Sequence, residues 1–149
     1  MVALAALSAD QLSKWFMVAI VMDPPRTIPV APFFNLVLGF NRGVSFGLLS
    51  DLGPAGPTVI TVLSITIVAF LFAWLWRSTA AWDVVGIAMV IGGALGNLID
   101  RIRNGAVTDF LDFYVGQFHW PAFNLADTGI TMGVGLLLIG SLRGSGKAR

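Results

Sequence analysis

Residues 57–76 contain no charged side chain, and this constrains the fold more than any other feature of the sequence. The segment reads PTVITVLSITIVAFLFAWLW. Twenty residues of α-helix extend about 30 Å, which is the thickness of the hydrocarbon core of a bilayer. Trp74 and Trp76 stand at its end beside Arg77, where interfacial side chains are expected. The segment is therefore predicted to span a membrane.

The rest of the chain has the composition of an integral membrane protein. Of its 149 residues, 56% are hydrophobic and 11% are charged, whereas a soluble domain carries about 25% charged residues. The sequence predicts an all-α membrane protein, a single domain over 1–149 with four transmembrane helices. The expected spans are 1–22, 57–77, 82–103 and 123–143. Both termini are predicted to be cytoplasmic, because the carboxyl-terminal tail is basic at Arg143, Lys147 and Arg149.

Two longer connections, 23–56 and 104–122, are expected on the other, extracytoplasmic side. The first is rich in proline and glycine and contains the stretch FFNLVLGF, so it is predicted to hold short strands or a hairpin. The second is aromatic-rich and too short to span, which predicts an interfacial loop or one folded against the bundle.

Composition also excludes several functions. A net charge of +1 provides no basic field for nucleic acid. Without cysteine there can be no disulfide, thiolate nucleophile or Cys-based metal site. One histidine with scattered aspartates is a poor ligand set, so neither a metal nor a cofactor is predicted. His119, in QFHWP, is interpreted as an interfacial polar group.

Ionisable side chains within a span cost about 2.5–3.5 kcal/mol near its centre and are therefore functional candidates. Asp10 and Lys14, in DQLSK, are four residues apart and share a helix face. They form either a neutralised pair that packs into the bundle or a support for an active site. Asn97 and Asp100, in GGALGNLIDR, share another face and are followed by Arg101. The alternatives here are an Asp100–Arg101 pair and a role in a site.

Two glycine-containing stretches accompany these polar groups. Gly92, Gly93 and Gly96 would let another helix, or a substrate helix, approach closely. In NRGVSFG, Gly43 and Gly47 are expected to adopt backbone geometry that other residues avoid, although an ordinary surface turn is an equal alternative.

Asp109, in VTDF, and Asp127, in FNLAD, could form a pair of carboxylates at one membrane depth. Asn124 precedes Asp127 by three residues and is expected to share its helix face. In apolar surroundings, burial and mutual repulsion would raise one pKa, so that one carboxyl is protonated and the other ionised. Such a pair can activate water for attack on a peptide carbonyl. Two unrelated interfacial aspartates are the alternative, and Asp112 competes as the partner if the loop is helical.

Five motifs in order, DQLSK, NRGVSF, GGALGNLIDR, VTDF and FNLAD, resemble the bacterial lipoprotein signal peptidase family, also called signal peptidase II. The resemblance runs from Asp10 to about Gly133, with Ser45 where the family more often has alanine. It implies a four-helix membrane aspartyl protease without a cofactor. Its partners would be membrane lipid and prolipoprotein signal peptides, which it cuts just before a diacylglyceryl-modified cysteine at the outer surface of the bacterial cytoplasmic membrane. The protein is expected to be a monomer.

The resemblance also implies a role for each motif residue. Asp109 and Asp127 would be the catalytic pair, which decides against Asp112. The positions implied for substrate binding and site support are Asn41, Gly43, Asn97, Arg101, Asn124 and Ala126. Asp10, Lys14 and Asp100 would be structural polar residues.

Two other functions remain as alternatives. A small proton-coupled transporter would use the intramembrane aspartates as a relay, but it predicts inverted repeats, which the two halves of the sequence do not show. A non-enzymatic assembly factor explains the packing glycines, but not the aspartate pair beside Asn124.

Overall fold

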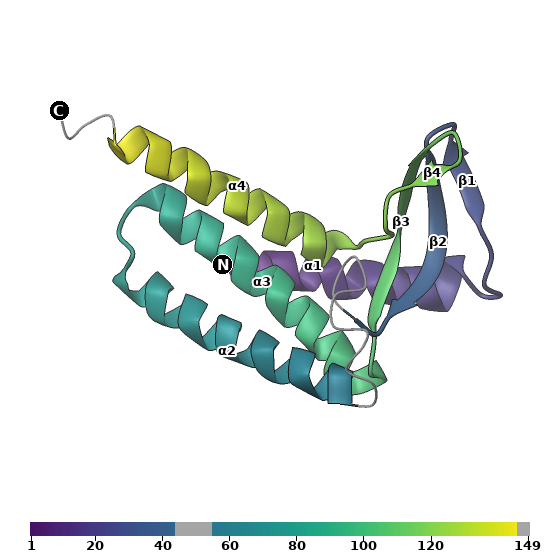
Figure 1. Ribbon diagram of the computed structural model, residues 1–149, viewed down its shortest axis with the longest axis horizontal. Helices are drawn as coiled ribbons and strands as arrows, with labels where there is room; N and C mark the ends of the chain where they lie inside the picture. Colours follow the sequence, from purple (N-terminus) through teal and green to yellow (C-terminus); the bar gives the residue numbers. More distant parts are fainter. Residues whose placement is uncertain (44–54, 146–149) are drawn as a thin grey trace.

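The structure is a computed structural model that describes residues 1–43 and 55–145. Ser45 and Gly47 lie outside these residues. The described elements are α1 (Val2–Phe16), which continues in π-helical geometry as η1 (Met17–Val21), β1 (Ile28–Ala31), β2 (Phe34–Asn41), α2 (Gly56–Arg77), α3 (Ala81–Asn104), β3 (Val107–Val115), β4 (Phe118–His119) and α4 (Leu125–Ser145). Figure 1 shows the helices as a bundle with the sheet at one end.

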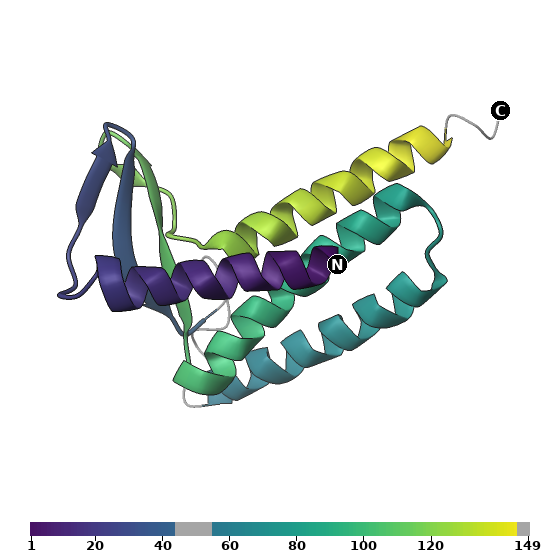
Figure 2. The same ribbon diagram turned by 180° about the vertical axis from the view of Figure 1, so that it is seen from behind.

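The prediction of four membrane spans is confirmed for the described chain. Its candidate spans are Val2–Val21, Gly56–Arg77, Ala81–Asn104 and Leu125–Arg143, which differ from the predicted bounds by at most two residues at either end. Helices α1 and α3 run toward the sheet, whereas α2 and α4 run away from it (Figures 1 and 2). The described chain therefore begins, at α1, and ends, at Ser145 of α4, on the side of the bundle away from the sheet.

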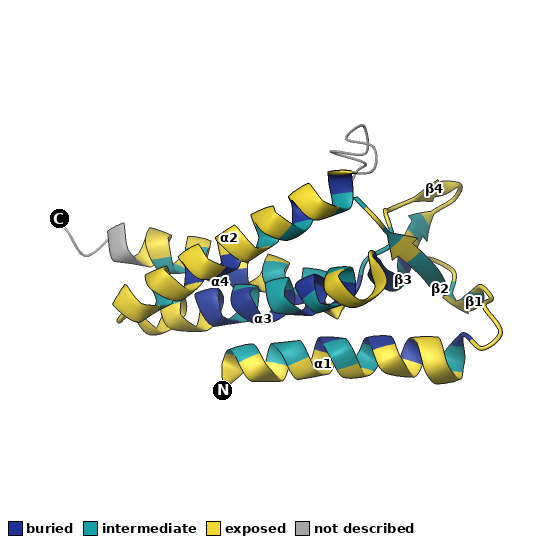
Figure 3. Ribbon diagram, turned by 90° about the horizontal axis from the view of Figure 1, so that it is seen from below, coloured by how far each residue is buried: buried dark blue, intermediate teal, exposed yellow. Residues whose placement is uncertain are grey.

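Helix α3 is the centre of the bundle and packs against each of the other three helices. Ile87 and Ile91 are completely buried and pack with Leu71 of α2. The outward faces of α1, α2 and α4 are exposed and largely apolar, as Figure 3 shows in yellow. Such faces suit contact with lipid, because a helix satisfies its own backbone hydrogen bonds there.

The glycines of α3 permit this close packing, but with the protein's own helices. A Cβ on Gly92 would lie 2.5 Å from the backbone oxygen of Ala3 in α1. A Cβ on Gly96 would collide with Asp10, and one on Gly93 would collide with the backbone oxygen of Ala126 in α4. The expected packing role is confirmed, whereas the alternative that these glycines admit a substrate helix is wrong.

Replacing Gly93 by alanine is expected to destabilise the bundle by about 1–3 kcal/mol, because the new methyl group has no space between α3 and α4. The matched control is Gly135→Ala in α4, where a Cβ would meet nothing within 4 Å. That change should be neutral or stabilising, since alanine is the better helix former. Thermal unfolding in detergent compares the two variants, and equal melting temperatures would contradict the packing argument.

The sheet is antiparallel and has the order β1-β2-β3-β4. The β1–β2 hairpin confirms the strands predicted in the first connection, and the second connection forms β3 and β4. An irregularity in β2 between Leu36 and Gly39 places Gly39 opposite Asp109. Phe113 stacks between Phe34 and Phe123, with ring centroids 4.6 and 5.8 Å away. The aromatic residues therefore join the sheet to the segment that leads into α4.

Candidate active site

Strand β3 and the segment before α4 are joined through their backbones. The amide nitrogens of Phe110 and Leu111 donate to the oxygen of Phe123 at 3.0 and 2.8 Å, and the nitrogen of Phe123 donates back to Leu111 at 3.0 Å. These bonds hold the start of α4 beside β3. Asp109 and Asp127 are thereby brought to one place by elements that are separate in sequence.

Asn124 caps helix α4 and does not lie on its face, contrary to the expectation from its spacing to Asp127. The helix begins at Leu125, one residue later. The Oδ1 of Asn124 accepts a hydrogen bond from the backbone nitrogen of Asp127 at 3.0 Å, and Oδ2 of Asp127 lies 3.4 Å from the backbone nitrogen of Asn124. This reciprocal arrangement is a capping box, in which the side-chain oxygen of each residue faces the backbone N–H group of the other.

The same asparagine also binds the second aspartate. Its Nδ2 lies 2.7 Å from Oδ1 of Asp109, 3.2 Å from Oδ1 of Asn97 and 3.3 Å from the backbone oxygen of Thr108. Asn97 in turn donates from Nδ2 to Oδ1 of Asp127 at 2.8 Å. Two neutral amides therefore connect the two carboxylates, and Asn124 is fully buried between them.

Asp109 is 4% exposed, and this burial has an electrostatic consequence. Burial and, second to it, the nearby charge of Asp127 together raise the pKa of Asp109 to about 6, against the opposing effect of hydrogen bonds from Asn41 and Asn124. A buried carboxyl with a pKa near neutrality is suited to donate or accept a proton during a reaction.

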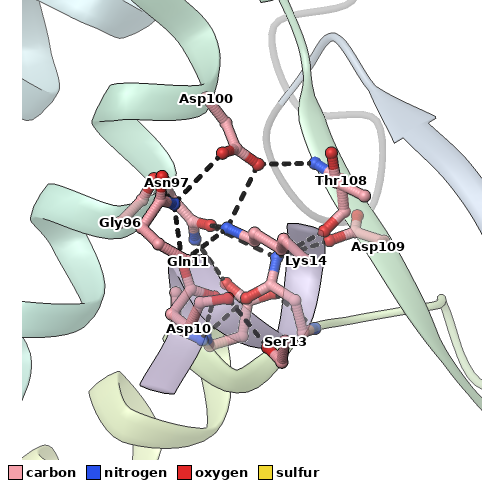
Figure 4. A network of polar contacts seen from close by, with 12 residues as sticks. Asp10, Gln11, Ser13, Lys14, Gly96, Asn97, Asp100, Thr108 and Asp109 are labelled. Atoms are coloured by element: carbon pink, nitrogen blue, oxygen red, sulfur yellow. Dashed lines mark hydrogen bonds and ion pairs between the residues drawn. The ribbon is translucent and has the colours of Figure 1, made fainter. Parts of the chain in front are cut away.

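Figure 4 shows a buried polar cluster around Lys14, with Asp109 beside it. The Nζ of Lys14 is 2.9 Å from Asp10, 3.2 Å from Asp100 and 2.9 Å from Oδ1 of Asn97. The predicted Asp10–Lys14 pair is confirmed. The alternative of an Asp100–Arg101 pair is wrong, because Asp100 binds Lys14 on the neighbouring helix.

Each acidic partner of Lys14 holds a piece of backbone beside one of the two aspartates. The Oδ1 of Asp10 accepts the amide hydrogen of Ala126 at 2.9 Å, and Oδ2 of Asp100 accepts that of Thr108 at 2.9 Å. Ala126 directly precedes Asp127, and Thr108 directly precedes Asp109. The cluster therefore fixes the positions of both carboxylates relative to α1 and α3.

Gln11 belongs to the same cluster and was not singled out by the sequence. Its Nε2 lies 3.1 Å from Oδ2 of Asp10, 3.2 Å from Oδ1 of Asp100 and 3.2 Å from the backbone oxygen of Gly96. An amide in an apolar span, three residues before Lys14, is the signal that could have identified it. Its contacts complete the hydrogen bonding of two buried carboxylates.

Asn41, Gly43 and Arg101 lie beside Asp109. Asn41 hydrogen-bonds to Asp109, and its Oδ1 accepts the backbone amide hydrogen of Gly43 at 3.0 Å. The guanidinium of Arg101 lies 3.4 Å from the backbone oxygen of Gly43. The special geometry expected at Gly43 is absent: among the described glycines, positive φ occurs at Gly105 and at Gly116.

Asp112 is separated from this site because β3 is extended, so that residues three apart point to opposite faces. It accepts hydrogen bonds from Asn35 at 3.0 Å and from His119 at 2.8 Å. Burial would raise the pKa of Asp112, but these hydrogen bonds and the His119 charge hold it below its usual value. His119 also stacks on Tyr114, with ring centroids 4.9 Å apart. Both residues thus fasten the β3–β4 hairpin.

The sequence model of the Signal peptidase (SPase) II family matches residues 2–143. The lipoprotein signal peptidase of Cupriavidus taiwanensis is 42% identical over 141 residues, covering 93% of this chain and 80% of the relative. That of Azoarcus sp. (strain BH72) is 43% identical over 142 residues, covering 95% and 80%.

Two solved structures, each of a bacterial membrane enzyme, share the fold. One has a TM-score of 0.85 and 29% sequence identity, and it covers 99% of this chain and 89% of its own. The other has a TM-score of 0.78 and 30% identity, and it covers 95% and 90%. The likeness therefore extends over the helices and the sheet together.

Proposed function

Because the chain belongs to the signal peptidase II family, we propose that it is an aspartyl endopeptidase that removes signal peptides from diacylglyceryl-modified prolipoproteins. The cut falls just before the lipid-modified cysteine. The observation that carries the aspartyl mechanism is the pair Asp109 and Asp127, joined through Asn124 at the sheet end of the bundle.

The reaction needs one protonated and one ionised carboxyl. The ionised group accepts a proton from water as the water oxygen attacks the scissile carbonyl carbon. The protonated group donates to the carbonyl oxygen, where negative charge develops. When the carbon–nitrogen bond breaks, the amine takes up a proton. Neither a metal ion nor a covalent intermediate is required.

The surrounding polar residues are proposed to serve this pair in two ways. Asn97 and Asn124 orient the carboxylates directly, whereas Asp10, Lys14 and Asp100 hold the backbone behind them. Asn41, Gly43 and Arg101, beside Asp109, are proposed to meet the substrate. Ala126 is buried, and its backbone oxygen packs against Gly93 of α3.

The proposed location is the bacterial cytoplasmic membrane, with both termini in the cytoplasm. The pair then lies near the extracytoplasmic surface, because Asp127 is in the first turn of α4 and Asp109 is in the sheet. A lipid-modified signal peptide anchored in the membrane would present its cleavage site at this depth. The site is built from one chain, which supports a single-domain monomer as the active unit.

A cleavage assay tests the proposal. The purified protein in detergent is incubated with a prolipoprotein fragment that carries a diacylglyceryl cysteine, and with the same fragment unmodified. We expect cleavage immediately before the modified cysteine and at least 10-fold slower cleavage, on the order of the binding contribution of a buried acyl chain, for the unmodified fragment. Equal cleavage of both fragments, or none of either, would contradict it.

The transporter alternative is disfavoured by the position of the polar groups. Asp10, Lys14 and Asp100 bind one another, and with the aspartate pair they form one network near the sheet. A proton relay needs ionisable groups distributed along the path across the membrane. Proton flux can be measured in liposomes that contain the protein and an internal pH dye. Flux in the absence of any substrate peptide would support transport.

A further inference from the structure

We propose that the two aspartates have fixed, different roles: Asp127 is the ionised carboxylate that takes the proton from water, and Asp109 carries the proton in the resting enzyme. The inference rests on the proposed function and adds to it the direction of proton transfer. Three features of the surroundings distinguish the two carboxyl groups.

The first feature is the helix start. Asp127 lies in the first turn of α4, where the positive end of the helix dipole favours a negative charge. Its Oδ2 faces the backbone nitrogen of Asn124 in the capping box. Asp109 lies within strand β3, and a strand provides no comparable dipole.

The second feature is the hydrogen bond from Asn97. Its Nδ2 donates to Asp127 at 2.8 Å, while Oδ1 of the same amide accepts from the ammonium group of Lys14 at 2.9 Å. A cation on the oxygen side polarises the amide and strengthens its N–H as a donor. Lys14 thus favours the charged form of Asp127 through Asn97. Asp109 receives its hydrogen bonds from Asn41 and from Asn124, and the Nδ2 of Asn124 also faces Asn97 and Thr108.

The third feature is access to water. Asp109 is 4% exposed, whereas Asp127 is only partly buried. Removal of water disfavours the charged form of a carboxyl, so Asp109 is the better place for the proton. Burial, with the charge of Asp127, raises the pKa of Asp109 to about 6.

The other charged groups near the pair come from α1 and α3. Asp10 and Asp100 are bound to Lys14, and Arg101 lies near enough to interact electrostatically with Asp100, Asp109 and Asp127. Arg101 acts on both carboxyl groups, and its interaction with Asp127 is stronger than that with Asp109. The asymmetry therefore comes from the start of α4, the Lys14–Asn97 contact and the deeper burial of Asp109, and Arg101 adds to it.

The assignment gives a balanced reaction. Asp127 takes one proton from water as the new carbon–oxygen bond forms, and Asp109 gives its proton to the carbonyl oxygen, leaving a tetrahedral diol. In the second step the carbon–nitrogen bond breaks, and the amine nitrogen takes the proton held by Asp127. One diol hydroxyl returns its proton to Asp109, so that the resting state is restored.

Titration of ¹³C-labelled aspartate carboxyls by NMR tests the assignment in the resting, full-length protein. We expect one carboxyl to titrate at about pH 6. Its signal should be absent from Asp109→Asn. It should persist in Asp127→Asn but shift to lower pH, because a neighbouring negative charge is gone. Asp112→Asn is the matched control and should leave the signal unchanged. A signal lost from Asp127→Asn and kept in Asp109→Asn, or lost from both, would overturn the assignment.

The pH dependence of kcat/KM provides a second measurement, which does not require the Asp109→Asn and Asp127→Asn variants to fold. Since Asp109 must be protonated, kcat/KM should fall about tenfold per pH unit above its pKa, which is about 6. Asn97→Ala removes the polarised donor from Asp127, so the acidic limb of the profile should move to higher pH while the basic limb stays. If Asn97→Ala moved only the basic limb of the profile, the proton donor and acceptor roles of Asp109 and Asp127 would be the reverse of those proposed.

The two proposals fail in different ways. If Asp109→Asn or Asp127→Asn, correctly folded, cleaves the lipid-modified fragment at the normal rate, the aspartyl mechanism is wrong whatever the titration shows. If both variants are inactive but the signal near pH 6 belongs to Asp127, the mechanism stands and the assignment of roles is wrong.

Discussion

Replacing either Asp109 or Asp127 by asparagine is expected to lower the rate of prolipoprotein cleavage by roughly 10²–10⁴-fold, the usual contribution of a positioned proton-transfer group. Asparagine has the size of aspartate but can neither accept the proton of the attacking water nor donate one to the carbonyl oxygen. The loss should appear in kcat, because these groups act on the transition state more than on the bound peptide. Steady-state cleavage of a lipid-modified fragment measures it.

Asp112→Asn is the control for this experiment. Asp112 is a buried aspartate on the same strand, but its partners are Asn35 and His119. The variant should therefore cleave at nearly the wild-type rate. The melting temperature of each variant must be compared with wild type, so that loss of fold is not taken for loss of chemistry. An inactive, well-folded Asp112→Asn would show that the reacting pair has been misassigned.

Replacing Lys14 by methionine is expected to cost about 3–5 kcal/mol of stability, the penalty for breaking a buried ion pair from one side. Asp10 and Asp100 are 0% and 5% exposed, and both lose their cation in this variant. The backbone N–H groups of Ala126 and Thr108 remain as partners but carry no full charge. Thermal unfolding in detergent should therefore show a large decrease in melting temperature.

Two further variants isolate the cause of that decrease. Arg103→Met removes an exposed cation from the last turn of α3 and should have little effect. Adding Asp10→Asn to Lys14→Met should restore part of the lost stability, since one uncompensated charge is removed while the side-chain oxygen can still accept from Ala126. The ion-pair explanation would be contradicted if Lys14→Met melted at the same temperature as Arg103→Met. It would also be contradicted if the double variant were less stable than Lys14→Met alone.

The membrane helices could be predicted from the sequence almost to the residue. Segment length in a membrane is set by the thickness of the hydrocarbon core, and charge-free stretches show it directly. The pair Asp10–Lys14 was equally accessible, because residues four apart on a helix must lie on one face. Both predictions depend only on local geometry.

Contacts between elements were harder to predict. An ion pair between Asp100 and its sequence neighbour Arg101 was one alternative. Adjacent residues on a helix do not face each other, however. The partner of Asp100 is Lys14, which comes from another helix. The capping role of Asn124 depends on where α4 begins, and a helix boundary is uncertain by one or two residues. The role of Gln11 could not be predicted because two of its three acceptors, Gly96 and Asp100, lie on α3.

The hydrogen bond from Ala126 to Asp10 has a consequence for biosynthesis. It joins residues 116 positions apart, one in the first helix and one in the last. During translation, the first three helices and β3 emerge before α4, so a growing chain contains Asp109 but lacks Asp127 and its capping asparagine. The pair is complete only when the last helix has entered the bilayer and docked on the first. A partly synthesised chain that lacks α4 is thus without a paired carboxylate.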